Sequence, residues 1–277
     1  MKRAITAAAR VQHVAPYSRL FVLFTGMERV VALLDCVAGW AERGAHVRLA
    51  GLTPAALEAD ADQRASQHFF NRITLGATLD ASRELLALRG IGADCKFLGI
   101  GPDSAARTEA LARAVRDWKA DLTIGAPANP VALAGETDCP VLLLPTLTAR
   151  HCQAPPRRVF VASDGSAASA CAVREAARLA APGTAVRVGY LACDPAAAQH
   201  PEDFDAAILE AQHDGETTAH AIVQAALQWG ADLLVLGTRG GHEGGRWRYG
   251  SVAADVAQRT VLPLLLVPLA SKTSMLT

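Results

Sequence analysis

The 277-residue chain has no net charge and no long apolar run. Lysine plus arginine number 27, and aspartate plus glutamate also number 27. The chain therefore lacks the overall basic surface that nucleic-acid-binding proteins carry. No apolar run reaches the ~18 residues that a membrane-spanning helix needs. These two absences argue against nucleic acid and against a membrane as partners.

The cysteines lack the paired spacing of a metal or redox motif. The six are scattered along the chain with no CxxC pair: Cys36, Cys95, Cys139, Cys152, Cys171 and Cys193. Such cysteines are typical of small buried apolar residues or of free thiols in a reducing compartment. Residues 1–16 are basic and alanine-rich, as a transit peptide or a frayed leader is, but they lack the apolar core of a secretory signal. We interpret them as a disordered or loosely docked extension of a cytoplasmic protein.

Catalytic patterns are also missing. The sequence shows no Ser–His–Asp arrangement, no paired carboxylates at a plausible site and no cluster of metal ligands. We therefore expect no catalytic residues and no protein metal site. If the chain is an enzyme at all, we expect at most a weak ATPase.

What the chain does contain is an internal repeat. Its composition, 51% hydrophobic and 19% charged, is that of a globular protein with one large or two ordinary domains. Trp118–Gly125 recurs as Trp229–Gly237, and Cys139–Pro145 recurs as Leu262–Pro268. Thr146–Arg158 contains prolines and polar residues typical of a linker. We predict one domain over residues 17–146 and a second over residues 157–270.

Hydrophobic periodicity predicts an α/β fold in each half, with a five-stranded parallel sheet flanked by helices. The expected strands are Leu20–Phe24, His46–Leu52, Asp94–Ile100, Asp121–Ile124 and Val141–Leu144, then Val159–Ala162, Ala185–Leu191, Ala206–Gln212, Asp232–Leu236 and Leu264–Val267. The expected helices are Val30–Arg43, Arg64–Arg89, Ser104–Trp118, a short turn at Pro130–Ala134, Ala167–Ala180, Glu216–Trp229 and Val252–Arg259. Ala206–Gln212 would suit a helix equally well.

The spacing between matching positions changes along the chain. Thr25 and Asp164, which follow the first strand of each half, are 139 positions apart, but Trp118 and Trp229 are only 111 apart. The second half has therefore lost residues between these points, and we predict that it lacks a counterpart of the helix Arg64–Arg89.

The most informative stretch runs from Gly237 to Ser251 and contains six glycines. It follows an apolar strand and precedes a helix, with Ser251 at the expected N-cap. Glycines let the backbone approach a phosphate closely, and a helix start offers unpaired N–H groups and a positive dipole end. The loop also carries three arginines: Arg239, Arg246 and Arg248. It has neither the Walker pattern nor the dinucleotide GxGxxG.

The spacing Gly237-x2-Gly240-x9-Gly250-Ser251 resembles the nucleotide loop of the universal stress protein family. The resemblance covers both halves, with the specific motif in the second, and implies tandem domains of adenine nucleotide alpha hydrolase-like fold. It implies that ATP or another adenine nucleotide binds, with or without Mg²⁺. The implied contacts are Asp164 to the adenosine part, the backbone at Leu191 and Ala192 to the adenine, and Gly237, Gly240, Gly250 and Ser251 to ribose and phosphates. We add Arg239 as a candidate phosphate contact.

The first half departs from this pattern. Thr25 stands where the acidic residue belongs, and Gly125-Ala126-Pro127-Ala128-Asn129-Pro130 replaces the loop. Two prolines remove backbone donors and stiffen the turn. We therefore predict one nucleotide site, in the second half. The resemblance also implies pairing through the last strand of each domain, which a tandem chain could satisfy internally; a homodimer stays open.

Two other functions remain alternatives to a nucleotide-binding stress-response or regulatory protein. One is a slow ATP hydrolase or phosphotransferase that uses the same loop. The other is an interaction module that binds no nucleotide and retains the loop as a relic. If ATP binds and replacing Gly240 by valine abolishes the binding, the protein is either the regulatory protein or the hydrolase and not the interaction module.

Overall fold

The computed structural model describes residues 17–25, 29–54, 61–101, 103–145, 152, 154–191, 204–209, 217–238 and 251–269, without the side chains of residues 54, 61–70, 191 and 251. The first half contains β1 (Tyr17–Phe24), α1 (Val30–Trp40), β2 (Ala41–Pro54), α2 (Ala61–Leu88), β3 (Gly92–Ile100), α3 (Ser104–Trp118), β4 (Leu122–Gly125), α4 (Pro130–Thr137) and β5 (Val141–Leu143). The second half contains β6 (Arg158–Ser163), α5 (Ala167–Leu179), β7 (Ala185–Leu191), β8 (Asp205–Leu209), α6 (Thr218–Trp229), β9 (Leu233–Thr238), α7 (Ser251–Arg259) and β10 (Leu264–Pro268).

The ten strands of the described residues join in one sheet, in the order β3-β2-β1-β4-β5-β10-β9-β6-β7-β8. Within each half the strand pairs are parallel. At the centre, β5 and β10 pair antiparallel, with Leu142 opposite Leu265. The strand order on one side of this pair mirrors the order on the other. The predicted α/β fold is therefore confirmed, and the two predicted five-stranded parallel sheets are the halves of one continuous sheet.

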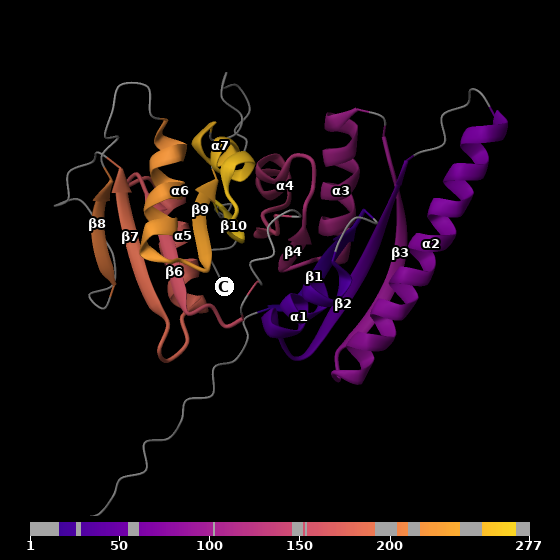
Figure 1. Ribbon diagram of the computed structural model, residues 1–277, viewed down its shortest axis with the longest axis horizontal. Coiled ribbons are helices and arrows are strands. Elements are labelled where there is room, and N and C mark those ends of the chain that lie inside the picture. The colour runs from indigo at the N-terminus through magenta and orange to yellow at the C-terminus, as the bar shows by residue number, and fades with distance from the viewer. Residues whose placement is uncertain are drawn as a thin grey trace, which may run out of the picture.

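Helices cover both faces of the sheet. On one face α1, α2 and α5 pack over a buried apolar cluster, and on the other α3, α4, α6 and α7 pack over a second. Figure 1 shows the second set as a row, with α4 beside α7 at the centre. Alternate strand residues supply the two clusters, as the pleat requires: Leu20 and Val22 face one, Phe21 and Leu23 the other.

Two predicted elements need correction or resolution. The first helix ends at Trp40 and not at Arg43, because Ala41 is extended and pairs with Tyr17 of β1. Sheet pairing thus overrides the helix propensity of the next residues. The ambiguous segment near Ala206 is a strand, because Asp205–Leu209 pairs with Arg187–Leu191 of β7.

The two halves also touch through side chains on the α1 face. The Tyr17 hydroxyl on β1 donates a hydrogen bond to Glu175 on α5. The Arg178 guanidinium lies 4.5 Å from the centre of the Tyr17 ring and is paired with Glu175. Burial and the neighbouring Glu175 carboxylate raise the pKa of Tyr17 well above its ordinary value. Tyr17 is therefore a neutral donor that joins the first strand to a helix of the second half.

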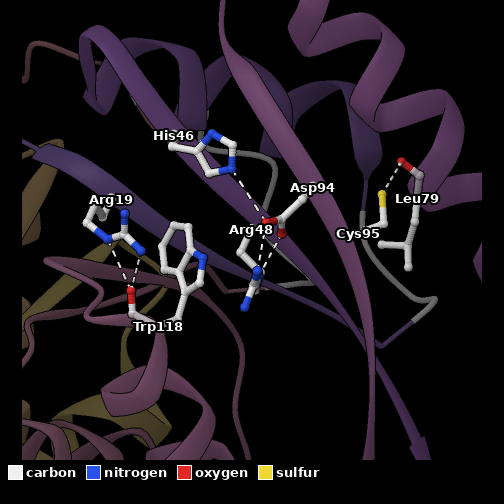
Figure 2. A network of polar contacts seen from close by, with 7 residues as sticks. All are labelled: Arg19, His46, Arg48, Leu79, Asp94, Cys95 and Trp118. Carbon is white, nitrogen blue, oxygen red and sulfur yellow. Dashed lines mark hydrogen bonds and ion pairs between the residues drawn. The ribbon is translucent and has the colours of Figure 1, made fainter.

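A network of charged and aromatic side chains lies near the amino ends of the first-half strands (Figure 2). Arg19 donates to the Trp118 carbonyl and lies 4.4 Å from the centre of the indole ring. Arg48 lies 5.2 Å from the same ring centre and pairs with Asp94 at 2.7 Å. Hydrogen bonds from Arg48 outweigh partial burial and lower the pKa of Asp94. The Trp118 ring is buried and packs beside Phe21.

The second half repeats this network. Arg158 donates to the Trp229 carbonyl at 2.7 Å, and both Arg158 and Arg187 lie over the Trp229 ring. Arg187 pairs with Asp205 as Arg48 pairs with Asp94. The arginine positions are 139 apart and the tryptophan and aspartate positions 111 apart. The change of spacing therefore falls between β7 and β8, the place that α2 occupies in the first half.

Candidate functional site

Asp164 follows β6 at the carboxyl edge of the second-half strands. Its Oδ1 accepts a hydrogen bond from the Ser166 N–H at 3.0 Å. Ser166, and not Asp164, is the N-cap of α5, since its Oγ accepts from the Ser169 N–H. Gly165 between them has φ +73°, a conformation that glycine adopts without strain.

The Asp164 carboxylate is charged at neutral pH and exposed to solvent. Partial burial raises its pKa, but hydrogen bonds from Ser166 and Ser169 outweigh burial, so that the pKa lies below the ordinary value. An exposed, ionised carboxylate is a strong hydrogen-bond acceptor. It can therefore accept from a ligand hydroxyl at this edge.

Gly237 lies in β9 directly against the first turn of α5. A Cβ on Gly237 would stand 2.2 Å from the Ala168 carbonyl oxygen and 2.8 Å from the Ser169 nitrogen, both backbone atoms. The missing side chain therefore lets α5 pack closely on the sheet. This packing requirement was not predicted from the sequence, which gave Gly237 only a ligand role.

Asp164 and Gly237 come together at the start of α5. β6 and β9 are neighbours with Ala162 opposite Leu236, so the two strands end side by side. Gly237 touches the first turn of α5, and Asp164 bonds the residue that caps this turn. The sequence separates the two residues by 73 positions; the parallel pairing of β6 with β9 removes that separation.

The remaining predicted site residues are only partly described. Leu191 ends β7, whose Tyr190 pairs with Ser163 of β6, so its backbone lies at the same edge. Ser251 is the first residue of α7, which returns the chain from the carboxyl end of β9 to the amino end of β10. Ala192, Arg239, Gly240 and Gly250 lie outside the described residues.

The corresponding edge of the first half is built differently. After Gly125 the chain turns into α4 within a few residues, and Asn129 is its N-cap. The Asn129 side chain accepts from the Ala132 N–H at 3.2 Å. Pro130, the first helical residue, has no N–H to donate. The start of α4 therefore has fewer donors for an anion than an uncapped helix start has.

Other features of the described residues lie away from this edge. A groove of about 790 Å³ runs between α6 and β6–β8 and is lined by Arg158, Phe160, Arg187, Leu209 and Trp229, among others. None of the predicted site residues that the structure describes lines it. Within the described ranges no group of three or more metal-ligating side chains occurs. No helix there is both long and apolar enough to cross a membrane.

The open sheet has helices on both faces, and the candidate site residues Asp164 and Gly237 lie at the carboxyl ends of parallel strands. This arrangement is that of a doubly wound α/β protein. Residues 210–268, which include β9, α7 and β10, match the universal stress protein family. This match covers about a fifth of the chain. The fold of the chain as a whole is that of solved universal stress proteins.

Solved structures agree with this fold. A universal stress protein from Archaeoglobus fulgidus is 14% identical, with TM-score 0.60, and the match covers 91% of this chain and 98% of that one. A protein of unknown function from Pseudomonas aeruginosa is 14% identical, with TM-score 0.54, and the match covers 91% and 92%. No curated protein sequence matches the chain.

Proposed function

We propose that this protein is a cytoplasmic stress-response or regulatory protein that binds one ATP, or another adenine nucleotide, in its second half. The meeting of Asp164 and Gly237 at the start of α5 is the observation that supports this most. Both residues belong to the pattern for which the sequence resembles the family. The family match over residues 210–268 covers the glycine spacing itself.

The described residues fit the two ends of a nucleotide. At one end, Asp164 offers an ionised acceptor for a ribose hydroxyl. At the other, α7 begins at Ser251 and directs its positive dipole end toward the carboxyl edge of the sheet. In this proposal the N–H groups of Gly240 and Gly250 and the charge of Arg239 hold the phosphates. The backbone at Leu191 and Ala192 meets the adenine.

The same reasoning limits the protein to one site. In the first half Thr25 has no carboxylate that could accept a hydrogen bond from a ribose hydroxyl. At the start of α4 the Asn129 side chain already accepts the Ala132 N–H, which is then not available to a phosphate. Pro130 removes another donor. The first half then serves as a scaffold that holds the central strand pair in place.

Titration of the full chain with ATP by isothermal calorimetry tests the proposal. We expect one ATP per chain. Gly240→Val should abolish binding by blocking backbone approach, and Asp164→Asn should weaken it about tenfold, as loss of a hydrogen bond to a charged group does. Gly237 is unsuitable for this test because a side chain there would displace α5.

Ala128→Val is the matched control, since Ala128 is exposed in the corresponding first-half connection. It should leave ATP affinity unchanged. Two equivalent sites, or unaltered binding by the Gly240 variant, would refute the proposal. Multiple-turnover phosphate release that disappears in the Gly240 variant would instead establish an ATP hydrolase.

A further inference from the structure

Two thiols from distant parts of the chain meet where the connection between the halves crosses α1. Cys36 lies on α1, and Cys152 lies between β5 and β6. The two side chains are in hydrogen-bond contact. Trp40 donates its indole N–H to the Cys152 sulfur at 3.2 Å. Because residues four apart share a helix face, α1 presents Cys36 and Trp40 together to Cys152.

A second contact holds the connection against the same helix. A Cβ on Gly39 would stand 2.4 Å from the Ala154 Cβ, so only glycine lets the two backbones approach this closely. Cys152 and Ala154, two residues apart, thus both contact α1, at Trp40 and at Gly39. These contacts fix the Cys152 sulfur beside α1 and beside Cys36.

The two thiols differ in their access to solvent. Cys36 is fully buried, whereas Cys152 is only partly buried. Burial raises the pKa of the Cys36 thiol well above its ordinary value, which makes it a poor first target for an oxidant. A dissolved oxidant therefore meets Cys152 first, with Cys36 in contact behind it.

The other described cysteines have different neighbours. Cys95 contacts the Leu79 carbonyl (Figure 2), and Cys139 contacts Thr123. Cys171 on α5 accepts a hydrogen bond from Arg174 at 3.0 Å. Among the described residues, Cys36 and Cys152 are therefore the thiols placed to react with each other.

We propose that Cys36 and Cys152 form a reversible disulfide when the protein meets a hydroperoxide. The Cys152 sulfur attacks the peroxide O–O bond, takes one oxygen and becomes a sulfenic acid, while an alcohol, or water from hydrogen peroxide, leaves. The Cys36 sulfur then attacks the sulfenic sulfur, and the hydroxyl leaves as water with the thiol proton. Two thiols and one hydroperoxide give one disulfide, one alcohol and one water; a dithiol reductant reverses the change.

The disulfide would tie the connection between the halves covalently to α1. It closes a loop from residue 36 to residue 152, which lies across the whole first half from α1 onward. Closing a loop of this length restricts the unfolded chain strongly. The oxidised protein should therefore melt at a temperature at least ~5 °C above that of the reduced protein.

Peptide mapping of the full chain tests the proposal. The protein is treated with hydrogen peroxide, blocked with N-ethylmaleimide in denaturant and digested with trypsin. We expect peptide 30–43, which holds Cys36, linked to peptide 151–157, which holds Cys152. Dithiothreitol should separate the two peptides and lower the melting temperature again.

Variants separate the two roles. Cys36→Ala keeps the buried position apolar and should leave a Cys152 sulfenic acid that dimedone traps. Cys152→Ser, at a partly exposed position, should leave Cys36 reduced. Cys95→Ser is the matched control and should not change the linked peptide. Oxidation of Cys152 to a sulfinic acid with Cys36 still free, or linkage of Cys152 to another cysteine, would overturn the proposal.

Discussion

Replacing Gly237 by alanine adds one methyl group at the closest helix–strand contact of the candidate site. The new Cβ would lie 2.2, 2.4 and 2.8 Å from three backbone atoms of Ala168 and Ser169. Backbone atoms in the first turn of a capped helix cannot move without disturbing the cap at Ser166. Overpacking of this kind costs about 1–3 kcal/mol, and the short distances to backbone argue for the upper end.

Urea unfolding followed by circular dichroism measures this cost, and thermal melting gives a second measure. A loss of about 3 kcal/mol corresponds to a fall in melting temperature of roughly 6–12 °C for a chain of this size. Gly99→Ala is the control, because a Cβ on Gly99 of β3 meets nothing within 4 Å. It should leave the free energy of unfolding within about 1 kcal/mol of the wild-type value, in either direction.

If Gly237→Ala unfolded with the wild-type free energy, within about 0.5 kcal/mol, the close packing of α5 on β9 would be wrong. Gly237 would then have only the ligand role that the sequence suggested. If Gly237→Ala lost stability while Gly99→Ala did not, the glycine would be required by the fold before any ligand binds.

Two substitutions elsewhere in the molecule and the pH dependence of ATP affinity provide further tests. Tyr17→Phe removes the hydrogen bond to the half-buried Glu175 and should cost about 1.5 kcal/mol in urea unfolding; no change would show that the contact between the halves contributes nothing. Hydrogen bonds from Arg48 lower the folded-state pKa of Asp94, so its stabilising contribution is present above the ordinary aspartate pKa and is lost as pH falls through the lower folded value. Asp94→Asn should therefore flatten the loss of stability between about pH 5 and pH 2, and an unchanged acid limb would contradict this. The pKa of Asp164 is also lowered, so ATP affinity that depends on its ionised carboxylate should hold from neutral pH down to the ordinary aspartate pKa of about 4 and fall only below it. A loss already near pH 6 would implicate another group.

Local chemistry predicts most of the elements because their signals are short-range. The helix Ser104–Trp118 has the predicted bounds, since Asp103 caps its start through the Ala106 N–H and Lys119 ends it in the left-handed conformation. The strand Ala185–Leu191 is also as predicted. The end of α1 was predicted three residues too late, because Ala41 pairs with Tyr17 of β1 and is therefore extended, whatever its helix propensity.

The candidate site was likewise predictable in part from the sequence. The spacing of Gly237, Gly240, Gly250 and Ser251 is visible in the sequence, as is the absence of both loop and acidic residue from the first half. The reason why position 237 needs a glycine is not visible, because Ala168 approaches it only once α5 has packed on β9. The arginine that lies over each tryptophan, Arg19 over Trp118 and Arg158 over Trp229, could also have been found from the sequence. The two arginines are 139 positions apart and the two tryptophans 111, which are the two offsets of the repeat.

By itself the sequence determined the α/β class, the repeat and the position of the glycine loop. These depend on periodicity, spacing and residue type, which are local properties of the sequence. Only the tertiary structure decided that the two halves share one sheet through β5 and β10, that Asp164 and Gly237 meet at α5, and that Cys36 touches Cys152. Such contacts join residues far apart in the chain, and strand pairing and helix packing bring them together without leaving a local pattern in the sequence.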